Sequence, residues 1–260
     1  MLWIDANGAS LRYELSGAGK DTLVLVHESG GCLESYDEVV PELAKEFRVL
    51  RYDQRAFGFS EKASALTLDS VAADLAGLLD ALGITAPVHL AGCAMGSDFA
   101  VAFASRYPER VAKLAIASPN MGRTKSAVNA MERAVQAERE GVRSTMNESH
   151  NRSWPAHLRA ADPERFRRYQ SRWVCNSPAS FMAQAKMMSN VDLTADYAKI
   201  RAKTLVIGAL HDVMRPPSVA QKVAGLLPGS TYVEADTGHF MALQTPRLFI
   251  DTVLPFLKAA

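Results

Sequence analysis

Short apolar runs alternate along the chain with longer stretches whose apolar residues recur at helical spacing. Residues 22–27 (TLVLVH) are apolar almost throughout, as expected for a strand that is buried on both faces. Residues 68–82 carry apolar side chains at intervals of three and four, and Gly83 follows as a helix-ending residue. Strands that alternate with helices predict an α/β protein with a doubly wound, mostly parallel, eight-stranded sheet. The predicted strands are 11–15, 22–27, 48–53, 88–91, 111–117, 204–207 and 231–234, and the predicted helices are 36–47 (with a kink or restart at Pro41), 68–82, 97–107, 218–227 and 246–257.

Residues 121–199 interrupt this alternation. The segment contains no convincing strand, is helical in pattern and is broken by proline at residues 155, 163 and 178. An all-helical insertion between two strands predicts a lid over one edge of the sheet. We therefore divide the chain into a core of residues 1–120 and 200–260 and an inserted helical lid of residues 121–199.

The predicted lid has an excess of positive charge. Residues 121–200 contain 13 lysines and arginines against 8 aspartates and glutamates. Most of these charges are expected on solvated helix faces. One or two arginines that point inward would hold a substrate carboxylate, a task that suits the planar guanidinium group. The candidates near expected turns are Arg123, Arg152 and Arg172. The candidate pocket or lid-core residues are Trp154, Trp173, Phe181, Met182, Met187 and Met188.

Composition narrows the possible partners. The chain has 29 lysines and arginines against 28 aspartates and glutamates, so it lacks the basic footprint of a nucleic-acid-binding protein. No apolar run approaches the ~20 residues of a membrane helix, and no secretory signal is visible, so we expect a cytoplasmic protein without a membrane partner.

The three cysteines are widely spaced, and His150, His157 and His211 lack a spacing that would place ligands together. We therefore expect neither a metal nor a cofactor.

The strongest chemical signal is the sequence Gly92-Cys93-Ala94-Met95-Gly96, between a predicted strand and a predicted helix. It has the frame of a nucleophile elbow, G-x-S-x-G, in which small residues let a tight strand-to-helix turn close around the central side chain. The central residue here is Ala94, which has no nucleophilic atom. Centring the turn on Cys93 would put the bulky Met95 at a small position, and Ser97 lies beyond the turn, so Ala94 fits the nucleophile position best.

An acid and a base follow the elbow in the order that this arrangement requires. Asp212 comes shortly after the predicted strand 204–207, and His239 follows the last predicted strand, next to Gly238. Active sites of open α/β sheets gather at the carboxyl ends of strands. A histidine base oriented by a buried carboxylate is the set that a hydroxyl nucleophile needs, so Asp212 and His239 are the predicted catalytic pair. Asp98 and Asp236 are weaker candidates for the acid.

These segments resemble the α/β-hydrolase superfamily over nearly the whole chain. Within it, the chain is most similar to the small-lid group that includes 3-oxoadipate enol-lactonases, esterases and carbon–carbon bond hydrolases. The resemblance implies the α/β-hydrolase fold and a Ser-His-Asp triad. The matching residues are 24–27 (VLVH) before a glycine-rich loop, 53–60 (DQRAFGFS, close to D-x-R-G-x-G-x-S), the elbow, Asp212 before Pro216-Pro217, and Gly238-His239-Phe240.

The resemblance also implies an oxyanion hole made by the backbone N–H groups of Ser29 and Met95. Glu28 departs from the family pattern, because it replaces the glycine of the family's His-Gly pair. Its carboxylate would either bond to loop N–H groups or reach the pocket and touch the substrate. Ala56 replaces another glycine, which implies a small structural adjustment. Phe240 is a further candidate for contact with the substrate.

Ala94 leaves two interpretations open. In the first it is a laboratory substitution of serine, and the parent is a serine-type hydrolase of a small ester or lactone, with or without a carboxylate, that the substitution has inactivated. A carbon–carbon bond hydrolase would use the same triad. In the second the natural protein lacks the nucleophile, and it is a ligand-binding module or an enzyme that uses His239 as a base. The partner in each case is a small molecule, and a homodimer is common for such folds.

Overall fold

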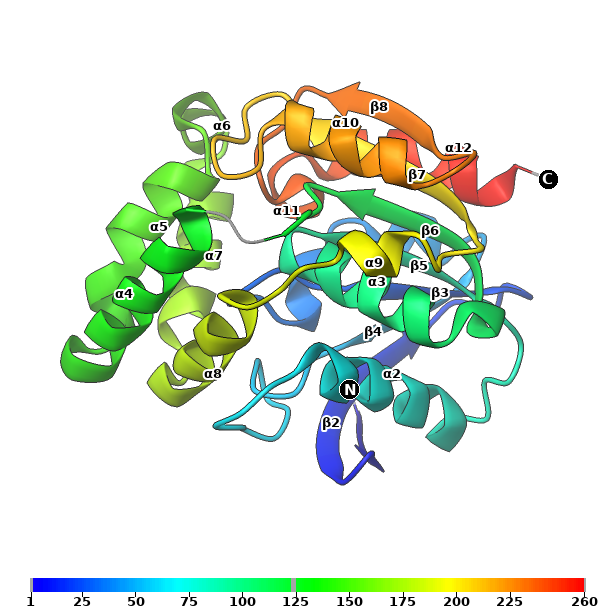
Figure 1. The fold of residues 1–260 in the computed structure, drawn as a ribbon, viewed down its shortest axis with the longest axis horizontal. Helices are drawn as coiled ribbons and strands as arrows, with labels where there is room; N and C mark the ends of the chain where they lie inside the picture. Colours follow the sequence, from blue (N-terminus) through cyan, green and yellow to red (C-terminus); the bar gives the residue numbers. More distant parts are fainter. Residues whose placement is uncertain (1, 123–124, 260) are drawn as a thin grey trace.

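A computed structural model describes residues 2–122 and 125–259, and its centre is a twisted sheet (Figure 1). Within the described residues the sheet has eight strands in the order β1-β2-β4-β3-β5-β6-β7-β8. β2 pairs antiparallel with β1 and β4, and the strands from β4 to β8 are parallel, which confirms the predicted doubly wound sheet. The strands are β1 (Leu2–Ala6), β2 (Ala9–Ser16), β3 (Thr22–Val26), β4 (Arg48–Tyr52), β5 (Val88–Cys93), β6 (Val111–Ala117), β7 (Lys203–Ala209) and β8 (Thr231–Ala235).

Helices cover both faces of the sheet and bury two separate apolar layers. One layer holds α2 (Leu68–Ala81), α3 (Met95–Arg106) and α10 (Pro217–Leu226), and the other holds α1 (Val40–Leu43), α11 (Met241–Gln244) and α12 (Pro246–Lys258). Both faces of the central strands are therefore apolar, as in β3, where every residue is buried. This packing fixes the carboxyl ends of β5, β7 and β8, which carry the candidate site.

The observed elements differ from the predicted ones at two places. The predicted helix 36–47 is reduced to α1, and a 3-10 turn, η1 (Leu33–Tyr36), precedes it; Pro41 lies in the first turn of α1, in agreement with the predicted restart. The first strand, β1, had no prediction of its own. It is an edge strand whose residues Leu2 and Trp3 are largely exposed, and its contiguous apolar residues, 2–4, are fewer than those of the central strand β3.

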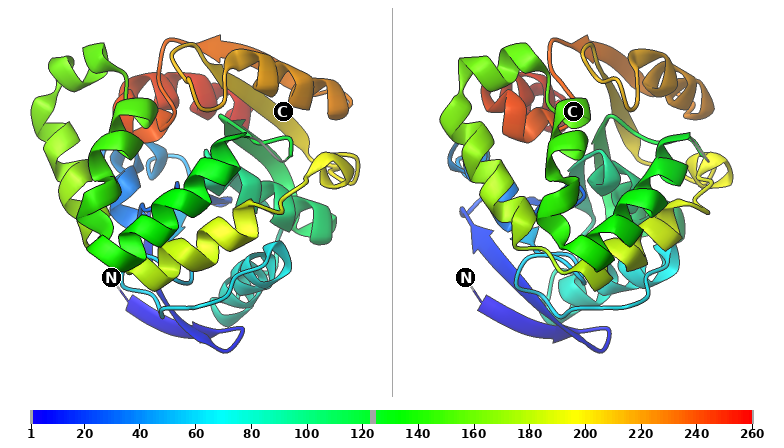
Figure 2. Two further views of the ribbon diagram at one scale, coloured as in Figure 1. Left: turned by 60° about the vertical axis from the view of Figure 1, so that its left-hand side comes forward. Right: turned by 90° about the vertical axis from the view of Figure 1, so that its left-hand side faces the viewer.

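The insertion between β6 and β7 is helical, as predicted. Its helices α4 to α8 lie together at one side of the sheet (Figures 1 and 2), whereas α9 lies against α3, where the Ser105 hydroxyl donates to Asp196 at 2.6 Å. We call the part from α4 to α8 the helical insertion; the domain bounds given above remain a prediction. Its elements are α4 (Lys125–Glu140), η3 (Val142–Thr145), α5 (Met146–Ser153), α6 (Ala156–Ala161), α7 (Pro163–Val174) and α8 (Pro178–Met188), followed by α9 (Thr194–Tyr197).

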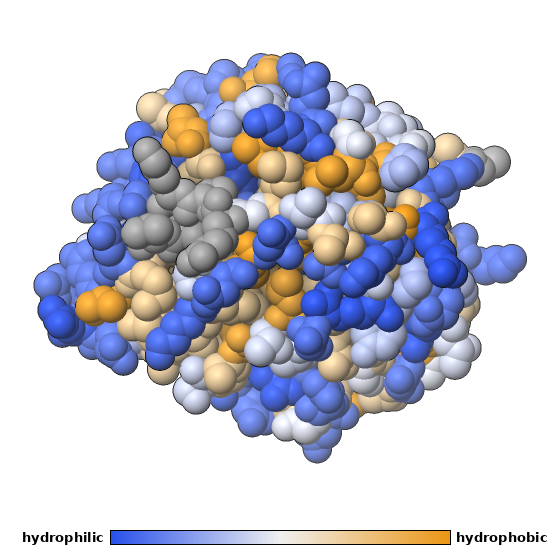
Figure 3. Space-filling view, in the orientation of Figure 1, coloured by the Kyte–Doolittle hydropathy of each residue, from blue (hydrophilic) through white to orange (hydrophobic). Residues whose placement is uncertain are grey.

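The outer surface is mixed in character. In the view of Figure 3, hydrophilic residues cover most of the face, and hydrophobic residues lie in small groups between them. Among the described residues, no helix combines the length and the apolar character that crossing a membrane requires.

Candidate active site

The turn between β5 and α3 has the strained geometry of a nucleophile elbow. Ala94 is the N-cap residue of α3 and has φ 53° and ψ −118°, a backbone region that costs energy for a residue with a side chain. The two glycines allow this turn to close. A Cβ on Gly96 would lie 2.0 Å from the Val26 carbonyl oxygen, and one on Gly92 would lie 2.5 Å from the Gly96 carbonyl oxygen. The turn therefore presents the side chain of residue 94 in the way that the sequence predicts.

Asp212 and His239 meet beside this turn. The His239 Nδ1 atom lies 2.6 Å from Asp212 Oδ2, and both side chains are buried. Asp212 Oδ1 accepts the backbone N–H groups of Met214 and Arg215 at 2.8 and 2.9 Å. Burial opposes ionisation of this carboxyl, but the positive charge and hydrogen bond of His239 outweigh it and keep the pKa of Asp212 below its usual value. The ionised Asp212 holds the proton on Nδ1 and leaves Nε2 as the basic nitrogen.

The other two acids face different partners. Asp98 is fully buried and binds Arg215 through two hydrogen bonds of 3.1 and 2.7 Å, and it also accepts the N–H of Asn120. Burial raises the pKa of Asp98, although Arg215 partly offsets this. Asp236 is exposed and lies 2.7 Å from His211 Nε2. Of the three acids, Asp212 alone is paired with His239 among the described residues.

The predicted oxyanion-hole residues lie on either side of the elbow. Met95 is the first residue of α3, where N–H groups have no acceptor inside the helix. Ser29 lies in the loop after β3, and its hydroxyl donates to Gln184 Oε1 at 2.8 Å, which fixes this loop against α8. Neither backbone N–H has a protein acceptor within residues 2–122 and 125–259. Both groups can therefore receive an oxyanion, and both residues line the cavity described next.

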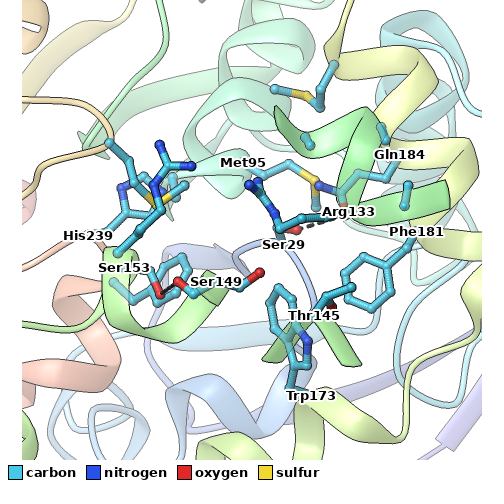
Figure 4. A pocket seen from close by; sticks show the side chains of 18 of the residues that line it. Ser29, Met95, Arg133, Thr145, Ser149, Ser153, Trp173, Phe181, Gln184 and His239 are labelled. Atoms are coloured by element: carbon cyan, nitrogen blue, oxygen red, sulfur yellow. Dashed lines mark hydrogen bonds between the residues drawn. The ribbon is translucent and has the colours of Figure 1, made fainter. Parts of the chain in front are cut away.

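A cavity of about 130 Å³ lies between the elbow and the helical insertion (Figure 4). Ala94, Met95 and His239 line it from the core, and Figure 4 shows Phe181 of α8 at the side opposite His239. The polar residues among its walls include Asn120, Arg133, Ser149, Arg152, Gln184 and Arg215, and the apolar ones include Ala130, Ala134, Ala137, Trp173, Met188 and Phe240.

Two arginines of the cavity wall have weak ion pairs. Arg133 of α4 and Arg152 of α5 share Glu148, at 3.5 and 3.9 Å. Burial lowers the pKa of Arg133, and Glu148 offsets this in part. At these distances Glu148 does not satisfy either fork-shaped guanidinium group, so both can bind a further anion. Arg152 was predicted from the sequence, whereas Arg133 was not. The spacing of Ala130, Arg133, Ala134 and Ala137 on one helix face is the signal that could have found it.

The remaining lid candidates lie elsewhere. Arg123 is outside the described residues. Arg172 donates to the Glu34 carbonyl oxygen at 2.9 Å and does not line the cavity. Trp154 is fully buried against Phe166 and Tyr169, with ring centroids 5.3 and 5.2 Å away, so its place is in the core of the insertion. Of the other candidates in the described part of the chain, Arg152, Trp173, Phe181 and Met188 line the cavity.

Glu28 is buried behind the oxyanion loop and does not line the cavity. Its Oε1 accepts the Ser35 hydroxyl at 2.8 Å, and a Cβ on Gly31 would lie 2.4 Å from the same oxygen. Burial raises the pKa of Glu28 to about 7, although hydrogen bonds from its own backbone and from Ser35 act in the opposite direction. The geometry favours the interpretation that this carboxylate supports the loop over the one in which it touches the substrate.

Two further details differ from the sequence analysis. Ala56 is buried with φ 82°, a conformation that favours glycine, so alanine occupies this turn at a cost in strain.

The expectation that the spacing of the histidines keeps them apart is wrong for His157 and His211, whose ring centroids are 4.5 Å apart. They come from segments more than 50 residues apart, and sequence spacing does not detect such a contact.

Comparisons with known proteins agree with this geometry. The chain is similar over 99% of its length to an enol-lactonase from Burkholderia xenovorans (28% identity, all of that chain covered, TM-score 0.94) and to a thermophilic esterase from Thermogutta terrifontis described with malate bound (27%, 98% of that chain, TM-score 0.93). It is 29% identical to a 2-hydroxy-6-oxo-2,4-heptadienoate hydrolase from Pseudomonas putida, over 98% of this chain and 95% of that protein. The model of the alpha/beta hydrolase fold family matches residues 21–246. The chain therefore belongs to the α/β-hydrolase family.

Proposed function

We propose that this site hydrolyses a small ester or lactone that carries an anionic group, with a serine at position 94 as the nucleophile. In the chain with Ala94, the same site holds the substrate without cleaving it. The observation that carries the proposal is the buried Asp212–His239 pair, whose histidine lines the cavity beside the elbow. A buried carboxylate that holds a histidine in one tautomer is the arrangement that a catalytic base requires.

The reaction follows from the positions of these groups. The serine oxygen attacks the carbonyl carbon while His239 Nε2 takes the hydroxyl proton, and the imidazolium is stabilised by Asp212. The N–H groups of Ser29 and Met95 bind the negative oxygen of the tetrahedral intermediate, and removing one such donor typically costs about 10²–10³ in rate. His239 then gives the proton to the leaving oxygen. Water attacks the acyl-enzyme by the same route and releases the acid, which restores the serine.

The residues that line the cavity support the proposal that the substrate carries an anionic group. Arg133 and Arg152 bring two positive charges to the wall formed by the insertion, and Glu148 neutralises one of them. A volume of about 130 Å³ suits a small acyl group. The similar structures of an enol-lactonase and of an esterase with malate bound support the same class of substrate.

A second candidate is hydrolysis of a carbon–carbon bond by the same residues. The relative from Pseudomonas putida, named as a hydrolase of 2-hydroxy-6-oxo-2,4-heptadienoate, favours it. In a third candidate function, Ala94 is the native residue and His239 acts as a base on a bound ligand. Analysis of the products separates the first two, and activity that does not depend on a serine identifies the third.

The test is to compare the Ala94→Ser variant with the unsubstituted chain on a short-chain aryl ester and on a carboxylated lactone. We expect kcat/KM to rise by at least about 10³ with Ala94→Ser, because removing the nucleophile of a serine hydrolase costs up to ~10⁶. Calorimetry with the lactone should show binding to both forms. A folded Ala94→Ser protein that hydrolyses no ester or lactone would refute the proposal.

A further inference from the structure

Three exposed side chains from distant segments meet at the rim between the helical insertion and the core. They are His157 on α6, His211 in the loop after β7 and Asp236 in the loop after β8. Their potential ligand atoms all lie within 4.8 Å of one another. His211 Nε2 is 2.7 Å from Asp236 Oδ1, and the His157 and His211 rings meet edge to face at 4.5 Å between centroids. Figure 1 shows α6 beside the loop that leads from β7 to α10.

The backbone around these residues is held on the core side. The N–H of Leu210 donates to the Ala235 carbonyl oxygen at 2.9 Å. The N–H of His211 donates to the Thr237 carbonyl oxygen at 3.0 Å. These bonds join the β7 and β8 loops on both sides of Asp236. The positions of His211 and Asp236 are therefore set by two loops that behave as one unit.

The insertion is fixed against the same loops just before α6. The Gln244 side-chain amide donates to the Ser153 carbonyl oxygen at 2.8 Å. Pro155 packs directly on Gly238, where an added Cβ would lie 2.4 Å from the proline Cδ. His157 follows two residues later, so this packing of the backbone brings the start of α6 up to the loops that carry His211 and Asp236.

The chemistry of the three ligands suits one class of ion. Two imidazole nitrogens and one carboxylate oxygen form a set that binds zinc and similar divalent transition metals, with water in the remaining positions. Asp236 has no lysine or arginine partner in the described part of the chain; its ion-pair partner is His211. The second cluster with suitable ligands, Cys32 with Glu34 and Asp53, already contains a cation, because the Arg12 guanidinium group binds both carboxylates.

We propose that His157, His211 and Asp236 bind one divalent transition-metal ion of the zinc class, and that this ion links the helical insertion to the core. Asp212 directly follows His211, and His239 lies three residues after Asp236. The ion would thus join the insertion to the two loops that carry the buried pair. Its role is to hold the insertion closed over the cavity, and it takes no part in the chemistry of the site.

The test is a titration of the full chain with ZnCl₂, followed by calorimetry, and with CoCl₂, followed by visible absorption. We expect one ion per chain and a rise in the unfolding temperature with zinc, because an ion that binds only the folded state stabilises it. His157→Gln, His211→Gln and Asp236→Asn should each weaken binding at least tenfold and abolish the thermal shift. All three residues are exposed, so these substitutions leave the fold intact.

Two control variants make the result specific. His239→Gln removes the buried histidine of the other pair, and Glu164→Gln removes an exposed carboxylate elsewhere on the insertion; both should bind zinc as the unsubstituted chain does. The proposal is overturned if no ion binds with 1:1 stoichiometry, if His157→Gln binds as tightly as the unsubstituted chain, or if His239→Gln abolishes binding. These readouts need no turnover, so they are independent of the proposed hydrolysis.

Discussion

Two histidine–carboxylate pairs are built on the same two loops, and they differ mainly in burial. The loop after β7 supplies His211 and Asp212, and the loop after β8 supplies Asp236 and His239, so the pairs cross between the loops. The contacts are 2.6 Å for His239–Asp212 and 2.7 Å for His211–Asp236. The exposed fractions are 4% and 0% in the first pair, and 43% and 78% in the second.

Equal geometry therefore does not mean equal chemistry. The buried carboxylate accepts two backbone N–H groups in addition to the histidine, so it stays ionised and fixes one tautomer. The exposed carboxylate can exchange its histidine for water or for a metal ion at little cost. The inner pair suits proton transfer at a fixed place, and the outer pair suits ligation of an ion.

The largest expected effect comes from breaking the buried pair. In the Ala94→Ser protein, Asp212→Asn should lower kcat on an ester by about 10⁴, because the wrong histidine tautomer is then stabilised. The matched change in the outer pair, Asp236→Asn, should alter kcat less than twofold in metal-free buffer. Steady-state kinetics on the two variants checks both values. Equal losses in both would show that burial does not separate the roles of the pairs.

Substituting Glu28 tests the burial of a carboxyl group that forms no ion pair among the described residues. Its folded pKa of about 7 lies above its ordinary value of 4.5, so the folded state holds a proton that the unfolded state has lost. The contribution of Glu28 to stability should therefore fall as the pH rises from about 4.5 to 7 and then level off. Glu28→Gln should remove this fall, a difference of about 3 kcal/mol between the ends of the window. Urea unfolding at pH 4.5 and 8 measures it, and parallel pH profiles for both proteins would contradict the account.

Arg133 is a cation whose carboxylate partner, Glu148, is distant. Substituting Arg133 tests whether its charge binds the anionic group of the substrate. Arg133→Gln in the Ala94→Ser protein should raise KM for a carboxylated lactone about tenfold, because a hydrogen bond to a charged group contributes about 1.5–3 kcal/mol. KM for an uncharged aryl ester should stay unchanged. Arg172→Gln, outside the cavity, is the matched control. A similar rise in KM for both substrates would mean that Arg133 supports the shape of the cavity and does not bind an anion.

The smallest expected effect comes from the exposed pair. His211→Gln should change the free energy of unfolding by less than about 0.5 kcal/mol in buffer with a chelator, because exposed ion pairs contribute little. Urea unfolding with and without zinc makes the comparison. A large loss of stability without metal would show that the outer pair is itself a structural interaction.

The sequence predicts the features that depend on neighbouring residues. The central strands, the elbow around Ala94, and Asp212 and His239 after their strands are all set by local patterns, and the structure brings these residues together. Arg133 and the His157–His211 contact depend on how helices of the insertion pack, which local patterns do not determine. Edge strand β1 was not predicted, because its apolar run within the strand is short, residues 2–4, and polar residues do not alternate with it.

The most direct test of the central claim uses a fluorophosphonate, which forms a bond to an activated serine. We predict that Ala94→Ser is labelled once, at residue 94, as located by mass spectrometry of peptides, and that adding Asp212→Asn slows labelling strongly. The chain with Ala94 should remain unlabelled. A folded Ala94→Ser protein that stays unlabelled, or that reacts equally fast with Asp212→Asn, would contradict the claim that this elbow and the buried pair form a site for a serine nucleophile.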